Sequence, residues 1–131
     1  MSRFQPTLVG LACCSVLALA FAADATACES SDKKPKIKVS VVNGEPVVDQ
    51  DPLRVCVGDE VHWVFAGSDA KEFKVKFASV ADSPFDWAEK NGSSVTGTVR
   101  PDAVKDGKAT PYLYDVKLDG TTLDPKIIVD P

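Results

Sequence analysis

The chain is poor in histidine and methionine, two residue types that supply ligands to many metal centres. His62 is the only histidine and Met1 the only methionine. A single imidazole excludes any centre that needs two. Glycine-rich phosphate loops are also missing, no run of lysine or arginine is longer than the pair Lys33-Lys34, and the formal net charge is -4. These absences argue against nucleotide binding and make nucleic acid an unexpected partner.

Long hydrophobic runs are missing as well, apart from one near the start of the chain. That run extends from Leu8 to Ala22 after the basic Arg3, and it is too short to span a bilayer comfortably. A basic start, an apolar middle and small residues at the end are typical of a secretory signal. We predict a signal peptide over residues 1–22, cleaved after Ala22 or alternatively after Ala27, and no transmembrane span in the mature chain.

Two of the four cysteines lie within this leader. The remaining Cys28 and Cys56 would then enter a compartment in which thiols are oxidised, so we expect them to form a disulfide. Cleavage after Ala27 would instead make Cys28 the first residue, which leaves a lipid anchor as the alternative. The predicted location is periplasmic or secreted, with lipid anchoring through Cys28 as the lesser possibility.

The mature chain reads as a flexible segment over 23–35 followed by one domain over 36–131. Alternation of apolar and polar residues predicts several short strands separated by turn residues. These strands lie near 36–41, 53–57, 60–65, 73–77, 95–99, 112–118 and 127–129. Ser83 as a cap and Pro84 at the first position predict a short helix over 84–90. The pattern favours an all-β, two-sheet Greek-key sandwich with one short loop helix.

Two stretches resemble the cupredoxin family, which has the fold of plastocyanin and azurin. The first runs from Leu53 through the Gly58-Asp59 turn to Phe65, and the second from Tyr112 through Gly120 to Val129. The resemblance implies a cupredoxin-like sandwich.

Copper-carrying members of that family place a cysteine after the tyrosine strand, then a histidine and usually a methionine. They place another histidine before the strand that here begins at Phe73. The corresponding positions in this chain hold Lys71 and Glu72, Asp115 and Val116, and Leu123. The resemblance therefore implies the fold without the copper ligands, and we expect no cofactor.

A few residues remain as candidates for a site. His62 and Glu60 form a weak candidate for a metal site. The carboxylates of Asp115 and Asp124, near a turn at Gly120, could meet a partner or serve as general acid and base. The aromatic residues Phe85 and Trp87 occupy a segment that could anchor a partner or close one end of the sandwich.

These observations predict a binding or accessory module of the cell envelope rather than an enzyme. Its partner would be an envelope protein or a small ligand, and we expect a monomer. Recognition by such a sandwich would use the end loops over 66–72, 78–92 and 119–125. The alternatives are a weak metal-binding protein that handles copper through His62, and a hydrolase that depends on the carboxylates of Asp115 and Asp124.

Overall fold

The computed structural model describes residue 28 and residues 33–131, and these residues form an all-β fold. The predicted signal peptide and most of the segment 23–35 lie outside the described residues. The strands are β1 (Lys36–Val42), β2 (Glu45–Val48), β3 (Leu53–Cys56), β4 (Glu60–Phe65), β5 (Phe73–Lys76), β6 (Glu89–Gly92), β7 (Ser94–Thr98), β8 (Thr110–Leu113), β9 (Asp115–Leu118), β10 (Thr121–Leu123) and β11 (Lys126–Asp130).

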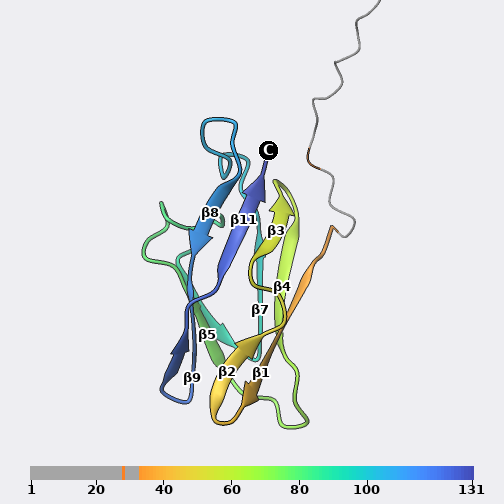
Figure 1. The fold of residues 1–131 in the computed structure, drawn as a ribbon, viewed down its shortest axis with the longest axis vertical. Helices are drawn as coiled ribbons and strands as arrows, with labels where there is room; N and C mark the ends of the chain where they lie inside the picture. The colour runs from red at the N-terminus through yellow and green to blue at the C-terminus, as the bar shows by residue number, and fades with distance from the viewer. Residues whose placement is uncertain (1–27, 29–32) are drawn as a thin grey trace, which may run out of the picture.

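The strands form two layers. One layer is the sheet β2-β1-β4-β7, and the other consists of the sheets β3-β11-β8 and β10-β9-β5-β6. The last two sheets are joined because β8 continues into β9 through Tyr114, so that β8, β11 and β3 lie side by side at one end and β9 and β5 at the other (Figure 1). The predicted all-β sandwich is confirmed.

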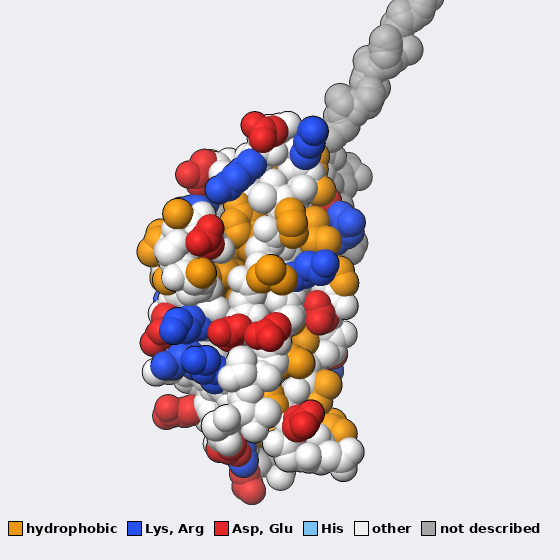
Figure 2. All heavy atoms as spheres, turned by 60° about the vertical axis from the view of Figure 1, so that its left-hand side comes forward, with side chains coloured by type: hydrophobic (Ala, Val, Ile, Leu, Met, Phe, Trp, Pro, Cys, Tyr) orange, Lys and Arg blue, Asp and Glu red, His pale blue; other side chains and the backbone are white. Residues whose placement is uncertain are grey.

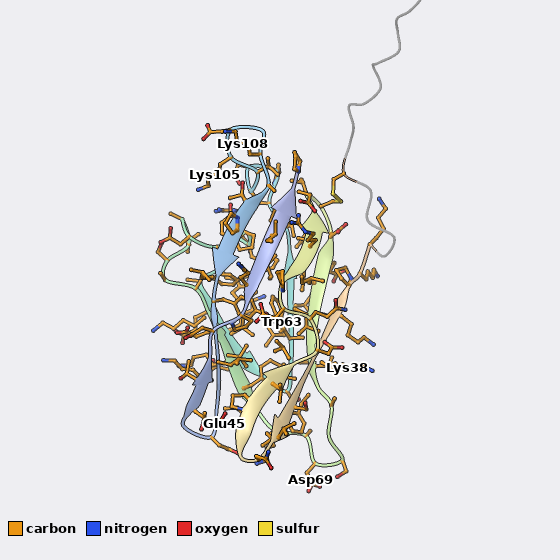
Figure 3. The ribbon with its side chains drawn as sticks, in the orientation of Figure 1. Lys38, Glu45, Trp63, Asp69, Lys105 and Lys108 are labelled. Carbon is orange, nitrogen blue, oxygen red and sulfur yellow. A yellow bond between two sulfur atoms is a disulfide. The ribbon has the colours of Figure 1, made fainter. Side chains whose placement is uncertain are left out.

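The buried side chains are the apolar ones that, in the sequence, alternate with polar residues along each strand and so share one face. Ile37, Val61, Trp63, Val75 and Val116 are each fully buried. Figure 3 shows Trp63 between the two layers at the middle of the sandwich. Because each of these side chains removes apolar surface from water, burial is worth about 1.5–3 kcal/mol per large aliphatic or aromatic residue.

The carboxyl-terminal part of the chain is one long antiparallel hairpin. Leu118 pairs with Thr121 across a turn in which Asp119 and Gly120 both have positive φ angles, 51° and 80°. An Asp-Gly pair with this backbone is typical of the tight type I′ turn of hairpins. The same register continues to the far end, where Thr110 pairs with Val129. The single strand expected over 112–118 is therefore present as β8 and β9.

The short helix predicted over 84–90 is wrong, because the described residues contain no helix. Ser83 does act as a cap in one respect, since its Oγ accepts a hydrogen bond from the Phe85 N–H at 3.0 Å. However, the Ser83 carbonyl accepts a hydrogen bond from Arg100 Nη2 and the Pro84 carbonyl one from the Arg100 N–H. These carbonyls are consequently turned toward Arg100, and the chain proceeds through bends into β6.

Cys28 and Cys56 form the predicted disulfide, with their Cα atoms 5.6 Å apart. The bond ties the residues before β1 to the end of β3. It also uses the Cys28 sulfur to which a lipid would be attached, so the disulfide and the lipid anchor exclude each other. Across the described part of the chain, no helix is both long and apolar enough to cross a membrane.

Candidate functional site

The long hairpin places Asp115 and Asp124 directly opposite each other. Leu123 pairs with Val116 on one side of them, and on the other side the Tyr114 N–H donates a hydrogen bond to the Pro125 carbonyl at 3.1 Å. Hydrogen-bonded and non-hydrogen-bonded pairs alternate along an antiparallel ladder, so Asp115 and Asp124 form a non-hydrogen-bonded pair. Side chains lie closest together in such pairs.

This proximity changes the protonation of the carboxyl pair. A hydrogen bond to the Asp124 carboxyl is the main cause that raises the pKa of Asp115, followed by partial burial and the negative charge of Asp124. The positive charges of Lys117 and Lys76 act in the opposite direction. Two carboxylates directly opposite each other repel when both are ionised, so the pair favours a shared proton or a cationic group placed against it.

A groove opens beside the carboxyl pair where two neighbouring strands part. Lys76 of β5 pairs with Asp115 of β9, and this pairing ends the ladder. The positions that would follow in the same register, Phe77 with Tyr114 and Ala78 with Leu113, are not paired. Two hollows meet at these residues. One, of about 370 Å³, is lined by Lys76, Phe77, Ala78, Leu113, Tyr114, Asp115 and Asp124. The other, of about 410 Å³, is lined by Ala78, Asp82, Pro111, Leu113 and Lys126.

The groove carries an apolar surface next to its charges. Leu113 is 69% exposed, which is the highest value among the exposed large hydrophobic residues of the described chain. Figure 2 shows the molecule turned so that the left-hand side of Figure 1 faces the viewer. Hydrophobic side chains gather on the upper half of this face, directly above a band of acidic and basic side chains. An exposed apolar patch with a charged rim is typical of an interaction site.

Leu113 was not among the residues predicted from the sequence. The signal was present, because the alternation that buries Tyr112 and Tyr114 places Leu113 on the opposite face, where a polar residue is expected. An apolar residue at an outward-facing strand position is the feature that marks this groove.

The two predicted aromatic candidates lie elsewhere and pack inward. Phe85 is fully buried, and its ring stacks on that of Trp87 with the centroids 5.1 Å apart. Both rings contact Trp63 edge-on, at 5.6 and 6.2 Å. Phe85 therefore offers no surface to a partner. Trp87 is half-buried and lines a separate pocket with Lys90, whose ammonium lies 5.1 Å from its ring centroid.

Gly97 of β7 makes room for these two rings. A Cβ atom at this position would lie 2.7 Å from Phe85 Cδ1 and 2.9 Å from Trp87 Cζ2. The rings thus fill the space that a larger residue would need. The two rings fill the space between the layers beside β7, an edge strand of its sheet.

The candidate metal pair His62 and Glu60 lies on β4, with His62 Nε2 3.5 Å from Glu60 Oε2. The other Glu60 oxygen lies 3.9 Å from the Lys34 ammonium. In residue 28 and residues 33–131, no group of three or more histidine, cysteine, aspartate or glutamate side chains is placed to hold a metal ion. The structure brings together only these two donors, with a lysine beside them.

The residues at the positions of the cupredoxin copper ligands do not fit copper. The Lys71 ammonium forms an ion pair with Asp119 at 2.7 Å, and it links the loop over 66–72 to the turn between β9 and β10. Val116 is fully buried and pairs with Leu123. A blue-copper site needs imidazole and thiolate donors, whereas an ammonium group and two aliphatic side chains supply none.

Comparison with known proteins finds a likeness in overall fold only. No protein-family model and no curated protein matches the chain. A copper(I) form of a methionine-to-alanine variant of amicyanin is 19% identical, with 78% of this chain and 87% of that chain covered and a TM-score of 0.45. A copper(I) methionine-to-glutamine variant is 18% identical, with 76% and 95% covered and a TM-score of 0.43. At these TM-scores the likeness carries nothing over to this chain, neither copper nor an activity.

Proposed function

We propose that the chain is an exported, copper-free, cupredoxin-like domain that serves as a binding or accessory module in the cell envelope and meets its partner at the groove between β8 and residues 78–82. The observation that carries this proposal is the exposed Leu113 beside the opposed carboxyls of Asp115 and Asp124. Water-exposed apolar surface and like charges in contact both cost free energy in the isolated domain. A partner that covers the first and neutralises the second removes both costs.

The predicted signal peptide and the disulfide support an exported location, because disulfides persist in oxidising compartments. The contents of the groove support binding rather than catalysis. Its walls offer one exposed leucine, backbone groups and a carboxyl pair, and its only described cations are Lys76 and Lys126.

Photo-crosslinking in the cells that make the protein tests this function. A photoreactive amino acid replaces Leu113 in one variant and Val57, which is 41% exposed in the turn between β3 and β4, in a matched control. We expect one discrete crosslinked partner from position 113 and none from position 57. Equal crosslinking from both positions, or none from either, would contradict a partner site at the groove.

A second candidate function has an observation of its own. Two carboxyls that share a proton can act as general acid and base in hydrolysis, and the structure brings Asp115 and Asp124 together in this way. A hydrolytic activity toward small esters, glycosides or peptides should then disappear in both Asp115→Asn and Asp124→Asn while the fold survives. An activity that persists in the double variant would end this candidate.

A further inference from the structure

The outer edge of β8 bears unpaired backbone groups that lie within the groove. The Tyr114 N–H donates a hydrogen bond to the Pro125 carbonyl. Backbone groups of alternate residues point to opposite sides of a strand, so the N–H and C=O of Tyr112 also point toward β11. The backbone groups of Leu113 and Pro111 point the other way, toward the outer side of β8. Within the described residues, no strand pairs with that outer side of β8. Proline has no N–H, so this edge offers the Leu113 N–H and the carbonyls of Leu113 and Pro111.

The opposite wall of the groove does not supply partners for these groups. Past β5, the Phe77 N–H donates to the Ala88 carbonyl on the far side. The following residues form a turn closed on itself, in which the Asp82 N–H donates to Ser79 and the Ser83 N–H to Val80. The wall therefore leaves a gap beside β8 instead of continuing the sheet.

We propose that an extended peptide segment of a partner protein occupies this gap, adds as a strand to the outer edge of β8, and places lysine or arginine side chains against Asp115 and Asp124. This inference rests on the proposed function and names the chemistry of the partner. Addition of a strand to a free sheet edge gives affinity through main-chain hydrogen bonds, and neighbouring pockets give specificity.

The side chains beside this edge define the sequence that fits. Leu113 and Ala78 present apolar surface at the point where the two hollows meet. The residue of the added peptide strand that lies beside them should therefore be apolar. The carboxyl pair lines one hollow together with Lys76, and Asp82 lines the other together with Lys126. The acidic side chains of the groove therefore outnumber its lysines, three to two. Leu113 and Asp115 lie two residues apart and therefore share the outward face of their strand. The segment that fits carries an apolar and a cationic residue two positions apart on one face.

Fluorescence anisotropy with synthetic peptides tests this inference on the purified, disulfide-bonded protein. The probe, called the lysine–valine peptide, is a labelled peptide of about nine residues in which valine and lysine alternate along one strand face, with threonine at the positions between them. One comparison peptide replaces every lysine by glutamate, and another carries N-methyl groups on alternate amides, which remove its hydrogen-bond donors on one edge. We expect saturable binding of the lysine–valine peptide that weakens with salt, and no binding of the other two.

Variants of the protein locate the binding. Asp115→Asn with Asp124→Asn should weaken the lysine–valine peptide about tenfold, as expected for the loss of charge-assisted hydrogen bonds. The double variant Asp69→Asn with Asp106→Asn removes the same charge at exposed sites outside the groove and should change affinity less than about twofold by long-range charge alone. Leu113→Asp adds a negative charge, which by itself would favour a cationic peptide. We nevertheless expect this variant to lose binding, because it removes the apolar contact, and circular dichroism verifies its fold.

Three results would overturn the proposal: equal affinity for the N-methylated peptide, equal losses in the two double variants, and no binding of the lysine–valine peptide at all. The last result can be separated from failure of the proposed function. If position 113 still crosslinks one discrete partner in cells, then the groove binds a partner of different chemistry, and only the strand-addition inference fails.

Discussion

Two regions of the molecule carry large apolar side chains outside the regular strand pattern, and they differ in what those side chains contact. Beside the edge strand β7, Phe85 and Trp87 stack on each other and against Trp63, over the space left by Gly97. At the groove, Leu113 remains 69% exposed. The first region stabilises the fold, whereas the second adds little to it. An aromatic-rich loop is therefore not in itself a binding site, and one exposed leucine in a strand is the better marker.

Truncation of Phe85 should have the largest effect. Phe85→Ala removes a fully buried ring from the aromatic cluster and should lower the free energy of unfolding by about 3–5 kcal/mol. Urea denaturation followed by tryptophan fluorescence measures this loss. Phe85→Leu, which keeps most of the volume, should cost less and remain folded. A loss below about 1 kcal/mol in Phe85→Ala would mean that the ring is not part of the core. The contrast between a fold-stabilising aromatic region and a groove that adds little stability would then be wrong.

A methyl group at Gly97 should disturb the same region more mildly. The added Cβ of Gly97→Ala meets Phe85 and Trp87 at less than the closest normal contact, so overpacking should cost about 1–3 kcal/mol. Thr96→Ala, at the adjacent position of β7, is the matched control and should change stability by less than about 0.5 kcal/mol. Equal changes in the free energy of unfolding for Gly97→Ala and Thr96→Ala would show that the rings of Phe85 and Trp87 shift at little cost to admit the methyl group.

The sequence was informative wherever one face of a strand is buried. The alternation at Phe73 to Lys76 and at Val61 to Phe65 predicted β5 and β4, because register is strongly specified when one face enters the core. The helix prediction failed at Ser83-Pro84 because local capping preferences were outweighed by burial of both Phe85 and Trp87. On a helix, residues two apart point in different directions, and here both must reach Trp63.

The carboxyl pair shows what could have been derived from the sequence and was not. An Asp119-Gly120 turn of two residues fixes the register of its hairpin, and counting outward from it places Asp115 opposite Asp124. The groove itself could not be derived in this way. It exists because the pairing of β5 with β9 ends at Lys76 and the residues after β5 do not continue along β8, and that separation depends on how residues 77–88 pack across the molecule.

Removal of one carboxyl should have a smaller effect on stability, and one that depends on pH. The raised pKa of Asp115 means that the folded state holds a proton more tightly than the unfolded chain. The stabilisation is therefore fully present below the ordinary aspartate pKa of about 4 and is lost as the pH rises through the raised value. Asp124→Asn should weaken this dependence, leaving only the part due to burial of Asp115, and raise stability at pH 7 by about 0.2–1 kcal/mol, the range for cross-strand pairs.

The pH series for wild type and Asp124→Asn is best measured by thermal unfolding between pH 3 and pH 7. Asp119→Asn is a suitable control, because it removes a carboxyl from the same hairpin and its asparagine tolerates the positive φ of the turn. That control does lose the ion pair with Lys71, so the comparison rests on the shape of the pH dependence. If the wild type and Asp124→Asn curves run parallel, then the two carboxyls do not share a proton.

Substitution of Leu113 should have the smallest effect on stability and the sharpest effect on binding. Leu113→Ser removes an exposed side chain, so the free energy of unfolding should stay within about 0.5 kcal/mol of wild type. Phe85→Leu, in contrast, should lose stability but keep the affinity for the lysine–valine peptide, because the groove is formed by other residues. This opposite behaviour separates a fold-stabilising region from a binding region. If Leu113→Ser instead destabilised the domain by more than 2 kcal/mol, the leucine would belong to the core and the groove would lose its role as a partner site.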